Sequence, residues 1–403
     1  MHHIRKPRVA VVYHFFAHYR AAIMQALLNS KDTEYVLVGD RLDPDRSIEP
    51  WQPPASRFVM APCMKLSSAL IWQSGVMKMA MRQDIDVMIF LGNANILSTW
   101  LAAGLGRILG KRVLFWTHGW IRHECGVKAI IRNLFYRLAH GLLLYGNRAK
   151  RIGILNGFPE EALYVIYNSL DCEAQKAARA KVTYSQTRQV REMHFPHSDA
   201  PVLICTSRLT KLRGLDLVLN AMSQLQKQGF DTCLLLVGDG PERIPLAQMA
   251  KDLCLAVHFY GPCYDEDRLA ELIMSANLTV APGKVGLTAM HSLVYGTPVI
   301  THDDADNQMP EFEAIIRGKT GDFFKRDDVG DLARVIRKWI ASPWPNEGTR
   351  QECYTIIDHY YNPDYQKAMI NRAVAGFPAE EPDTAYSNQS PSFLMGERIK
   401  NTH

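Results

Sequence analysis

Three cations stand close together after a strand-like run in the second half of the chain. Arg208, Lys211 and Arg213 lie in the segment 207–214, which follows the apolar run 202–206. Arginine presents a planar fork that matches phosphate oxygens, and lysine adds a point charge. The plain alternative is a solvated cationic face. The sharper interpretation is a clamp for a diphosphate.

A glycine-bearing loop before a short helix offers a second wall for such a site. Gly283 and Gly286 stand between the apolar run 278–280 and an expected helix at 288–295. Glycine lets the backbone approach a ligand closely, and the first amides of a helix favour an anion. A glycine-bearing turn of this kind also commonly connects a strand to a helix in α/β proteins without binding a ligand. The groups expected at the ligand are Lys284 and the amides of Gly286, Leu287, Thr288 and Ala289.

Other polar turns follow other expected strands. Gly238 lies in the Gly-Asp-Gly-Pro turn 238–241, and Tyr260 with Gly261 ends a third strand, where a nucleotide base could lodge. We therefore expect all three residues at a ligand-binding site, because ligands of parallel sheets bind at the carboxyl ends of the strands.

Two loops of the first half are also rich in chemistry. His14, Phe16, Tyr19 and Arg20 follow the first strand, and His118 follows the run 113–116. A lone histidine is more often structural than functional. His118 is the stronger candidate because a glycine follows it at a strand end.

The elements that must position these residues alternate between strand and helix. Continuous apolar strands between helices predict a parallel, doubly wound sheet, and the series occurs twice. We expect two Rossmann-like α/β domains facing a central cleft. The predicted strands are 9–13, 35–38, 87–90, 113–116, 202–206, 232–237 and 257–260, and the predicted helices are 19–28, 64–81, 97–109, 215–228, 244–253, 265–275 and 329–340.

The domain boundaries follow from composition. The polar segment 174–201 has few apolar anchors and is expected to be an interdomain segment, so a first domain is expected at 1–185 and a second at 196–345. A further helix is expected within residues 346–375. The Pro- and Ser-rich tail 376–403 is predicted to be disordered.

Composition is that of an ordinary globular protein. The net charge of +5 is mild for 403 residues, so charge gives no reason to expect nucleic-acid binding. The eight cysteines are scattered without a CxxC pair, which favours reduced thiols and predicts no structural metal. No apolar run of about 18 residues and no signal-peptide core is present, so we expect a cytoplasmic protein.

Residues 121–151 form a basic stretch with interleaved apolar residues at helical spacing. The default interpretation is a helix with a core-facing stripe and a solvated cationic face. The alternative is a peripheral surface for anionic lipid at the inner face of the cytoplasmic membrane. Its cations are Arg122, Lys128, Arg132, Arg137, Arg148, Lys150 and Arg151.

Taken together, these motifs resemble the donor domain of GT-B glycosyltransferases of the family-4, retaining type, and the resemblance covers roughly residues 8–340. It is strong in the second half and loose in the first. The matching segments are 207–214, 237–241, 260–261, 293–299, Glu313 with 318–321, and, in the first half, 117–119 and 166–171.

The resemblance implies a metal-independent hexosyltransferase with no cofactor. Its substrates would be a nucleotide-sugar donor and a glycan or lipid-linked acceptor. The first domain would bind the acceptor and the second the donor, and the helix within 346–375 would cross back to the first domain. Gly238, Tyr260 and Gly261 would bind the donor. Arg208, Lys211 and Arg213 would hold the diphosphate, and His118 would contact the sugar near its anomeric centre. His14, Phe16, Tyr19 and Arg20 would serve the acceptor.

One departure affects the donor side. Members of the family usually carry two glutamates at positions that here hold Gly283 and His291. His291 is expected to reach a ribose hydroxyl instead, and Lys284 the diphosphate or sugar. Two alternatives stay open: a nucleotide-sugar epimerase, and a nucleotide-sugar-binding protein without turnover.

Overall fold

The computed structural model describes residues 5–43, 48–341, 343–344 and 346–379, and these residues divide into two compact units. The first unit extends to Asp171 and resumes at Tyr361, whereas the second holds Cys172–Tyr360. The division therefore falls before position 185, where the sequence suggested a boundary. The tail predicted to be disordered lies outside the described residues from position 380 onward.

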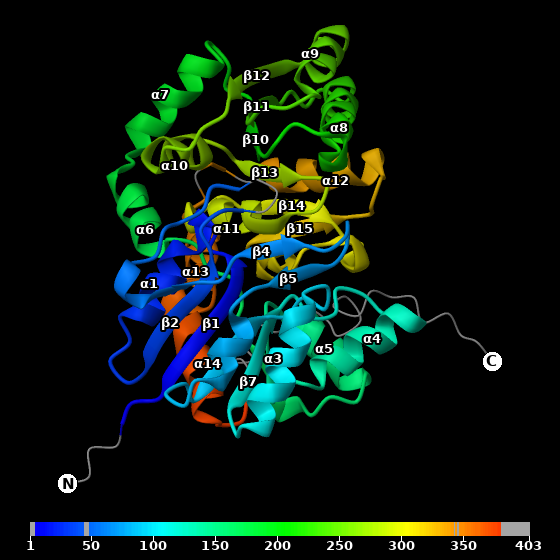
Figure 1. Ribbon diagram of the computed structural model, residues 1–403. Coiled ribbons are helices and arrows are strands. Elements are labelled where there is room, and N and C mark those ends of the chain that lie inside the picture. Colours follow the sequence, from blue (N-terminus) through cyan, green and yellow to red (C-terminus); the bar gives the residue numbers. More distant parts are fainter. Residues whose placement is uncertain (1–4, 44–47, 342, 345, 380–403) are drawn as a thin grey trace. The chain divides into compact units, whose positions relative to one another are not determined.

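Among the described residues of the first unit, a seven-stranded parallel sheet has the order β3-β2-β1-β6-β7-β8-β9 (Figure 1). Side chains alternate between its faces: Val9 and Val11 of β1 join one core, and Ala10 and Val12 join the other. Burial of both faces explains why these strands are apolar throughout. The strands are β1 (Arg8–Phe15), β2 (Glu34–Asp40), β3 (Phe58–Met60), β6 (Val87–Leu91), β7 (Arg112–Thr117), β8 (Gly141–Leu144) and β9 (Leu163–Val165).

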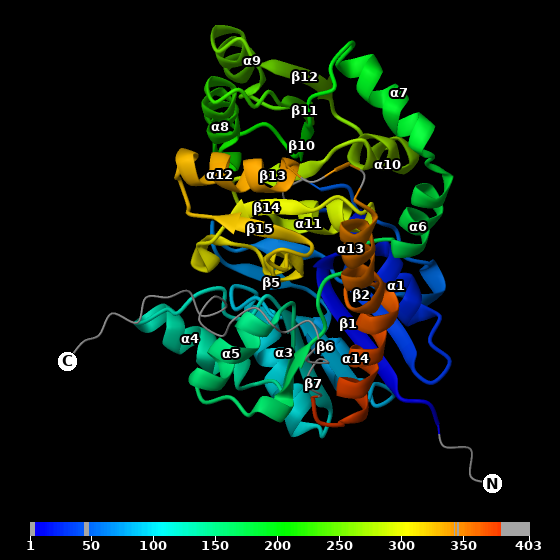
Figure 2. The same cartoon turned by 180° about the vertical axis from the view of Figure 1, so that it is seen from behind.

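Helices cover both faces of this sheet. One face packs against α1 and α14, which lie over β1 in Figure 2, and the other packs against α2, α3, α4 and α5. The helix α14 belongs to the C-terminal segment of the chain and contacts β7, β8 and β9. The helices are α1 (Ala21–Leu28), α2 (Val76–Met81), α3 (Leu97–Ile108), α4 (Val127–Tyr136), α5 (Asn147–Leu155) and α14 (Pro363–Ala375).

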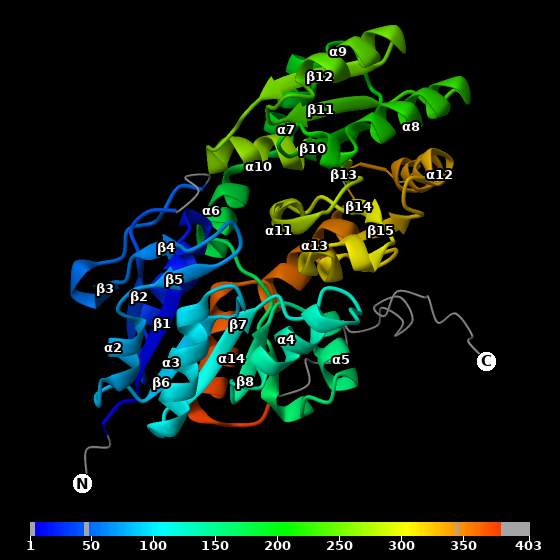
Figure 3. The same ribbon diagram turned by 45° about the vertical axis from the view of Figure 1, so that its right-hand side comes forward.

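The second unit holds a parallel sheet with the order β12-β11-β10-β13-β14-β15, seen in Figure 3. One face packs against α8, α9 and α12. The strands are β10 (Val202–Thr206), β11 (Cys233–Val237), β12 (Ala256–Gly261), β13 (Leu278–Ala281), β14 (Val299–His302) and β15 (Gly321–Phe324). The helices are α6 (Cys172–Lys181), α7 (Tyr184–His194), α8 (Leu215–Lys227), α9 (Arg243–Asp252), α10 (Glu266–Met274), α11 (Gly286–Val294), α12 (Val329–Ile340) and α13 (Glu347–His359).

The helix predicted at 64–81 is wrong for most of its length. The short strands β4 (Cys63–Lys65) and β5 (Ile71–Gln73) pair antiparallel, and only α2 is helical. Ser67 Oγ accepts the backbone N–H groups of Ala69 and Leu70, which closes a turn where the helix was expected.

Two other segments also differ from the prediction. The basic stretch 121–151 is not one helix, because β8 lies within it between β7 and β9 and is buried on both faces. The segment 174–201 is not a linker, because α6 and α7 pack on α10. A capping box of Thr183 and Gln186 begins α7, so few apolar residues suffice to form it.

Candidate functional site

The loop between β13 and α11 is held in place by one buried glutamine. Gln308 Oε1 accepts the N–H of Val285 at 3.0 Å, and its Nε2 donates to Thr301 Oγ1 at 2.8 Å and to the His302 carbonyl at 3.0 Å. Gly286 then begins the helix with a φ of +40°. The first turn of α11 therefore starts from a fixed position with free amides.

The cation-bearing loop after β10 packs directly against this glycine loop. Arg213 Nη1 donates to the carbonyl of Lys284 at 2.8 Å. A Cβ atom at Gly283 would lie 2.5 Å from the Leu212 carbonyl oxygen, so the contact is backbone to backbone. Thr288 Oγ1 donates to the Thr206 carbonyl at 3.0 Å and joins α11 to the end of β10. The two loops thus form one wall.

A cavity of about 690 Å³ opens at this wall. Among the described residues, the side chains of Arg208, Lys211 and Lys284 have no hydrogen-bond or ion-pair partner, whereas that of Arg326 is paired with Asp304 at 2.8 Å. The electrostatic field inside the cavity is positive, because cations outnumber carboxylates among the described lining residues and Asp327 is the only carboxylate there. The lining residues are Arg208, Thr210, Lys211, Leu212, Arg213, Gly214, Leu217, Pro282, Gly283, Lys284, Gly286, His302, Asn307, Met309, Arg326 and Asp327.

Several residues predicted for the donor lie outside that lining. Gly238 packs against the Ser207 carbonyl, where a Cβ would come within 2.0 Å, and it does not line the cavity. Tyr260 accepts a hydrogen bond from Arg268 Nε at 3.1 Å, its ring contacts His194, and it does not line the cavity. Gly261 accepts the Gly238 N–H through its carbonyl. Leu287 and Thr288 contribute backbone to α11 rather than lining side chains.

His291 is likewise absent from the cavity lining. Its Nδ1 lies 3.4 Å from Gln175 Nε2 and 3.7 Å from Glu266 Oε1, in a cluster that also contains Tyr295. Burial lowers the pKa of His291, and the neighbouring Glu266 acts in the opposite direction. The structure therefore places His291 in a polar contact between α11, α6 and α10.

In the first unit, Arg20 lies within an aromatic cluster at the strand ends. Its guanidinium carbon is 5.3 Å from the ring centre of Tyr13, 5.5 Å from that of Tyr145 and 5.7 Å from that of Trp116. Among the described residues no carboxylate pairs with Arg20, and its Nη1 has no hydrogen-bond partner. The aromatic rings stabilise the charge of Arg20, and with no carboxylate paired to it among the described residues this cation suits an anionic group on a ligand.

His118 joins the same cluster, with its ring 4.8 Å from that of Tyr145. Burial, assisted by the charge of Arg20, lowers the pKa of His118 to about 4. The imidazole is therefore neutral at pH 7 and suited to hydrogen-bond a hydroxyl group.

The remaining acceptor candidates are placed differently. Phe16 is 1% exposed and belongs to the hydrophobic core, so its ring offers no surface to a ligand. Tyr19 lies beneath Arg20 and beside His18, whereas the ring of His14 packs on Phe15 at 4.6 Å.

Sequence reasoning missed several residues of both sites. Tyr13, Trp116 and Tyr145 surround Arg20, and Gln308 positions the glycine loop. The aromatic residues stand at or just before strand ends, and Gln308 follows β14 by six positions. Reading every expected strand end as a possible ligand position would have found Tyr13 and Trp116, but not Tyr145, which no predicted strand precedes, or Gln308, which lies six positions beyond β14.

An exposed apolar face runs along α4. Val127, Ile130 and Leu134 are 70%, 66% and 58% exposed, at the spacing of one helix face. Lys128 and Arg132 lie on the same helix, and Arg132 is paired with Glu124 at 3.0 Å. Such a combination of apolar and basic residues suits the surface of an anionic bilayer.

Two negative findings apply to the described residues alone. No helix in that part of the chain is long and apolar enough to cross a membrane. No group of three or more His, Cys, Asp or Glu side chains is arranged there to hold a metal ion.

Comparison with protein families gives a match over most of the second unit. Residues 186–355 match the family model described as glycosyl transferases group 1. A GDP-mannose-dependent alpha-(1-6)-phosphatidylinositol monomannoside mannosyltransferase of Mycolicibacterium smegmatis is 26% identical over 282 residues, 63% of this chain and 69% of that protein. A glycogen synthase of Lactiplantibacillus plantarum is 30% identical over 40% of this chain, but the match spans only 34% of the synthase.

Solved structures extend the likeness to nearly the whole chain. Anabaena Alr3699/HepE in complex with UDP has a TM-score of 0.66 at 16% identity, and the match covers 93% of this chain and all of that one. A glycosyltransferase from Rickettsia africae has a TM-score of 0.67 at 14% identity, with 92% and 98% covered. At these identities the likeness concerns the fold alone.

Proposed function

We propose that this chain, whose residues 186–355 match the group 1 glycosyltransferases and whose fold is that of GT-B enzymes, transfers a hexose from a nucleotide-sugar donor to a lipid-linked or polysaccharide acceptor with retention of configuration. The cationic cavity beside α11 carries the proposal. Arg208, Lys211 and Arg213 line that cavity together with Gly286, the first residue of α11, and a combination of cations with a helix N-terminus suits a diphosphate.

In the proposed reaction the bond between the anomeric carbon and the diphosphate breaks while the acceptor oxygen bonds to that carbon. Negative charge grows on the leaving phosphate, and fixed cations and amides stabilise it. The acceptor proton passes to the departing phosphate, as the family resemblance implies. Neutral His118 then orients a hydroxyl of the sugar, and no metal is required.

The acceptor side of the proposal rests on Arg20 and the face of α4. Arg20 would bind an anionic group of the acceptor, and α4 would hold the enzyme at the inner face of the cytoplasmic membrane. A lipid-linked acceptor with a phosphate satisfies both features. Asp327 is the only carboxylate in the described lining of the cationic cavity. An epimerase would need several acidic residues at its site, so this lining favours a transferase.

Substitution of Arg213 tests the proposal. Arg213→Ala removes both a cavity cation and the bond to the Lys284 carbonyl, so we expect turnover to fall about 100-fold. Arg213→Lys keeps the point charge and should retain more activity. Transfer and donor hydrolysis are measured against UDP- and GDP-sugars, with Arg334→Ala on the exposed face of α12 as the control. Unchanged kinetics of Arg213→Ala with a verified donor would contradict the assignment. If the wild type hydrolyses the nucleotide sugar but transfers no sugar to an acceptor, the proposed acceptor is contradicted and only the proposed donor site is supported.

A further inference from the structure

A second cavity, of about 220 Å³, lies at the amino-terminal edge of the second unit's sheet. Asn277 and Pro298 line it just before β13 and β14 begin, and Gly318 lies shortly before β15. The cationic cavity lies at the opposite, carboxyl-terminal edge, around Gly283 and His302. The two cavities are therefore separate sites.

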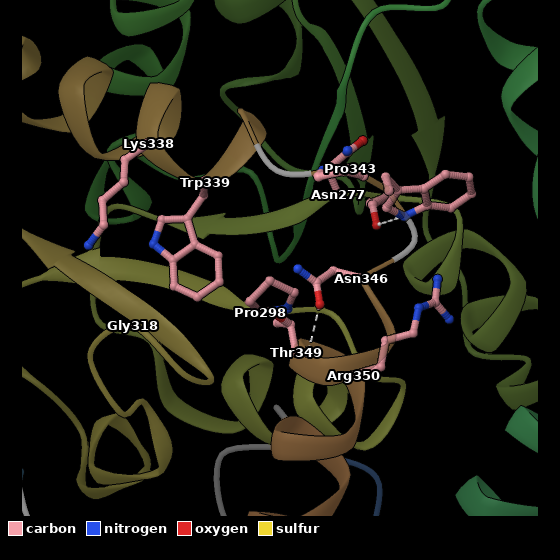
Figure 4. Close-up of a pocket in the computed structure, with 12 residues that line it drawn as sticks. Asn277, Pro298, Gly318, Lys338, Trp339, Pro343, Asn346, Thr349 and Arg350 are labelled. Atoms are coloured by element: carbon pink, nitrogen blue, oxygen red, sulfur yellow. Dashed lines mark hydrogen bonds between the residues drawn. The ribbon is translucent and has the colours of Figure 1, made fainter.

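Two indole side chains form walls of this second cavity. The two indoles belong to Trp339 and Trp344. Trp339 projects from α12 on one side of the cavity, and Arg350 of α13 lies on the opposite side (Figure 4). Trp344 is fixed, because its Nε1 donates to the Ala276 carbonyl at 2.9 Å and the Arg191 guanidinium lies 3.5 Å from its ring centre. A held aromatic side chain loses little entropy when a ligand binds.

Two asparagine side chains, Asn277 and Asn346, also line this cavity. Asn346 Oδ1 accepts the N–H of Thr349 at 3.0 Å, which orients the amide between Trp339 and Arg350 (Figure 4). Asn277 Oδ1 accepts the N–H of Val202 at 2.8 Å. The Nδ2 atom of each asparagine has no partner among the described residues.

Charge in this cavity is largely compensated. Lys338 Nζ lies 2.8 Å from Asp322 Oδ2, and Arg350 donates to the Met274 carbonyl at 3.0 Å with Glu347 at 4.0 Å. The described lining residues include no carboxylate. A phosphate would thus find fewer free cations here than at the cationic cavity, whereas a neutral ligand rich in acceptor oxygens would meet free amides.

We propose that this cavity binds one neutral pyranose unit of a saccharide, apart from the donor cavity. A sugar ring offers an apolar C–H face for an indole and hydroxyl oxygens for the two asparagines. The cavity volume of about 220 Å³ is below the roughly 300–1,000 Å³ of pockets that hold drug-sized ligands. We therefore assign it one sugar ring and not a longer saccharide. Such a site would hold a saccharide chain on the enzyme between transfers.

The experiment measures binding of methyl α-D-glucopyranoside, methyl α-D-mannopyranoside and methyl α-D-galactopyranoside by saturation-transfer NMR. UDP and GDP are added in turn at saturation, so that the donor cavity is filled. We expect at least one glycoside to bind, and its signal to persist with either nucleotide. Absence of binding by all three, or displacement by a nucleotide, would overturn the proposal.

Two variants locate the site. Asn346→Ser keeps an N-cap of equal quality but removes the free amide, and Trp339→Phe shortens the aromatic wall. We expect each to weaken glycoside binding at least fivefold. Asn362→Ser makes the same change at the N-cap of α14 and serves as the matched control. Nucleotide binding confirms that each variant is folded. Wild-type glycoside affinity in both cavity variants would also overturn the proposal.

Discussion

At the scale of single residues, the donor loop depends on the absence of a side chain as much as on its cations. Gly283 lies where a Cβ would meet the Leu212 carbonyl at 2.5 Å and the Arg213 Cα at 3.0 Å. The neighbouring atoms are backbone and cannot rotate away. A carboxylate side chain at this position is therefore incompatible with the observed packing of the two loops.

Gly283→Ala should separate these loops. We expect the free energy of unfolding to fall by about 1–3 kcal/mol, because an added methyl group overpacks the contact, and the affinity for UDP or GDP to fall more than tenfold. Chemical denaturation and calorimetric titration measure the two effects. The control is Gly104→Ala in α3, where a Cβ meets nothing within 4 Å and a helix gains propensity. Equal nucleotide affinity in Gly283→Ala and wild type would refute the packing argument.

His118 predicts a pH dependence of stability. Its folded pKa of about 4 lies below the usual 6.5, so the folded state binds fewer protons than the unfolded state between these values. The stability that this neutral histidine contributes is complete above pH 6.5 and is lost as the pH falls toward 4. His118→Gln should therefore lose less stability than the wild type between pH 7 and pH 4.5. Denaturant titrations at several pH values measure the free energy of unfolding. The control is His197→Gln, which replaces a histidine whose side chain is 94% exposed. Parallel curves for all three proteins would contradict it.

At the scale of elements, the position of α11 is decided by a residue outside the helix. Gln308 connects the loop before α11 to β14 through three hydrogen bonds and is 2% exposed. The helix can present its first amides to a ligand only while that loop is held. Gln308 thus acts as a positioning residue for the cavity.

Gln308→Leu leaves the buried Val285 N–H without its acceptor. We expect a loss of about 1–3 kcal/mol in unfolding free energy and at least tenfold weaker nucleotide binding. Gln308→Glu keeps a hydrogen-bond acceptor for the Val285 N–H and should bind the nucleotide more tightly than the leucine variant. A role for Gln308 in filling space alone would not explain such a difference. Gln351→Leu on the exposed face of α13 is the control. Calorimetry gives the affinities, and identical values for the leucine and glutamate variants would count against the positioning role.

At the scale of the whole molecule, a net charge of +5 is modest, so any attraction to membranes must come from local surfaces. The apolar face of α4 with its neighbouring cations is the surface to which the proposal assigns that role. Its residues are remote in sequence from the donor cavity. Membrane binding and nucleotide binding should therefore be separable.

Liposome flotation tests that separation. We expect wild-type protein to float with phosphatidylglycerol vesicles and not with phosphatidylcholine vesicles, and Ile130→Asp to abolish flotation by placing a charge on the apolar face. Ile244→Asp on α9, at a position that is 81% exposed, is the matched control. Nucleotide affinity should be the same in all three proteins. Equal recovery with both vesicle types would argue against α4 as an anionic-lipid surface.

Much of the fold was readable from the sequence because strands buried on both faces are continuously apolar. The runs at 9–13, 87–90 and 233–237 are of this kind, and each lies in a parallel sheet. Segments with mixed composition were misread. The turn at Ser67 and the capped helix α7 depend on hydrogen bonds to side chains, which hydrophobic periodicity does not register.

For the site, the sequence by itself determined which residue types could bind a diphosphate and that they follow strand ends. Arg208, Lys211, Arg213, Lys284 and Gly286 do line one cavity. Only the tertiary structure decided which neighbours share it. Tyr260 and His291 bond to α10 and α6 instead, and Gln308 arrives from a later loop. Spacing along a chain fixes the strand end at which a residue stands, whereas packing between helices fixes the direction of its side chain.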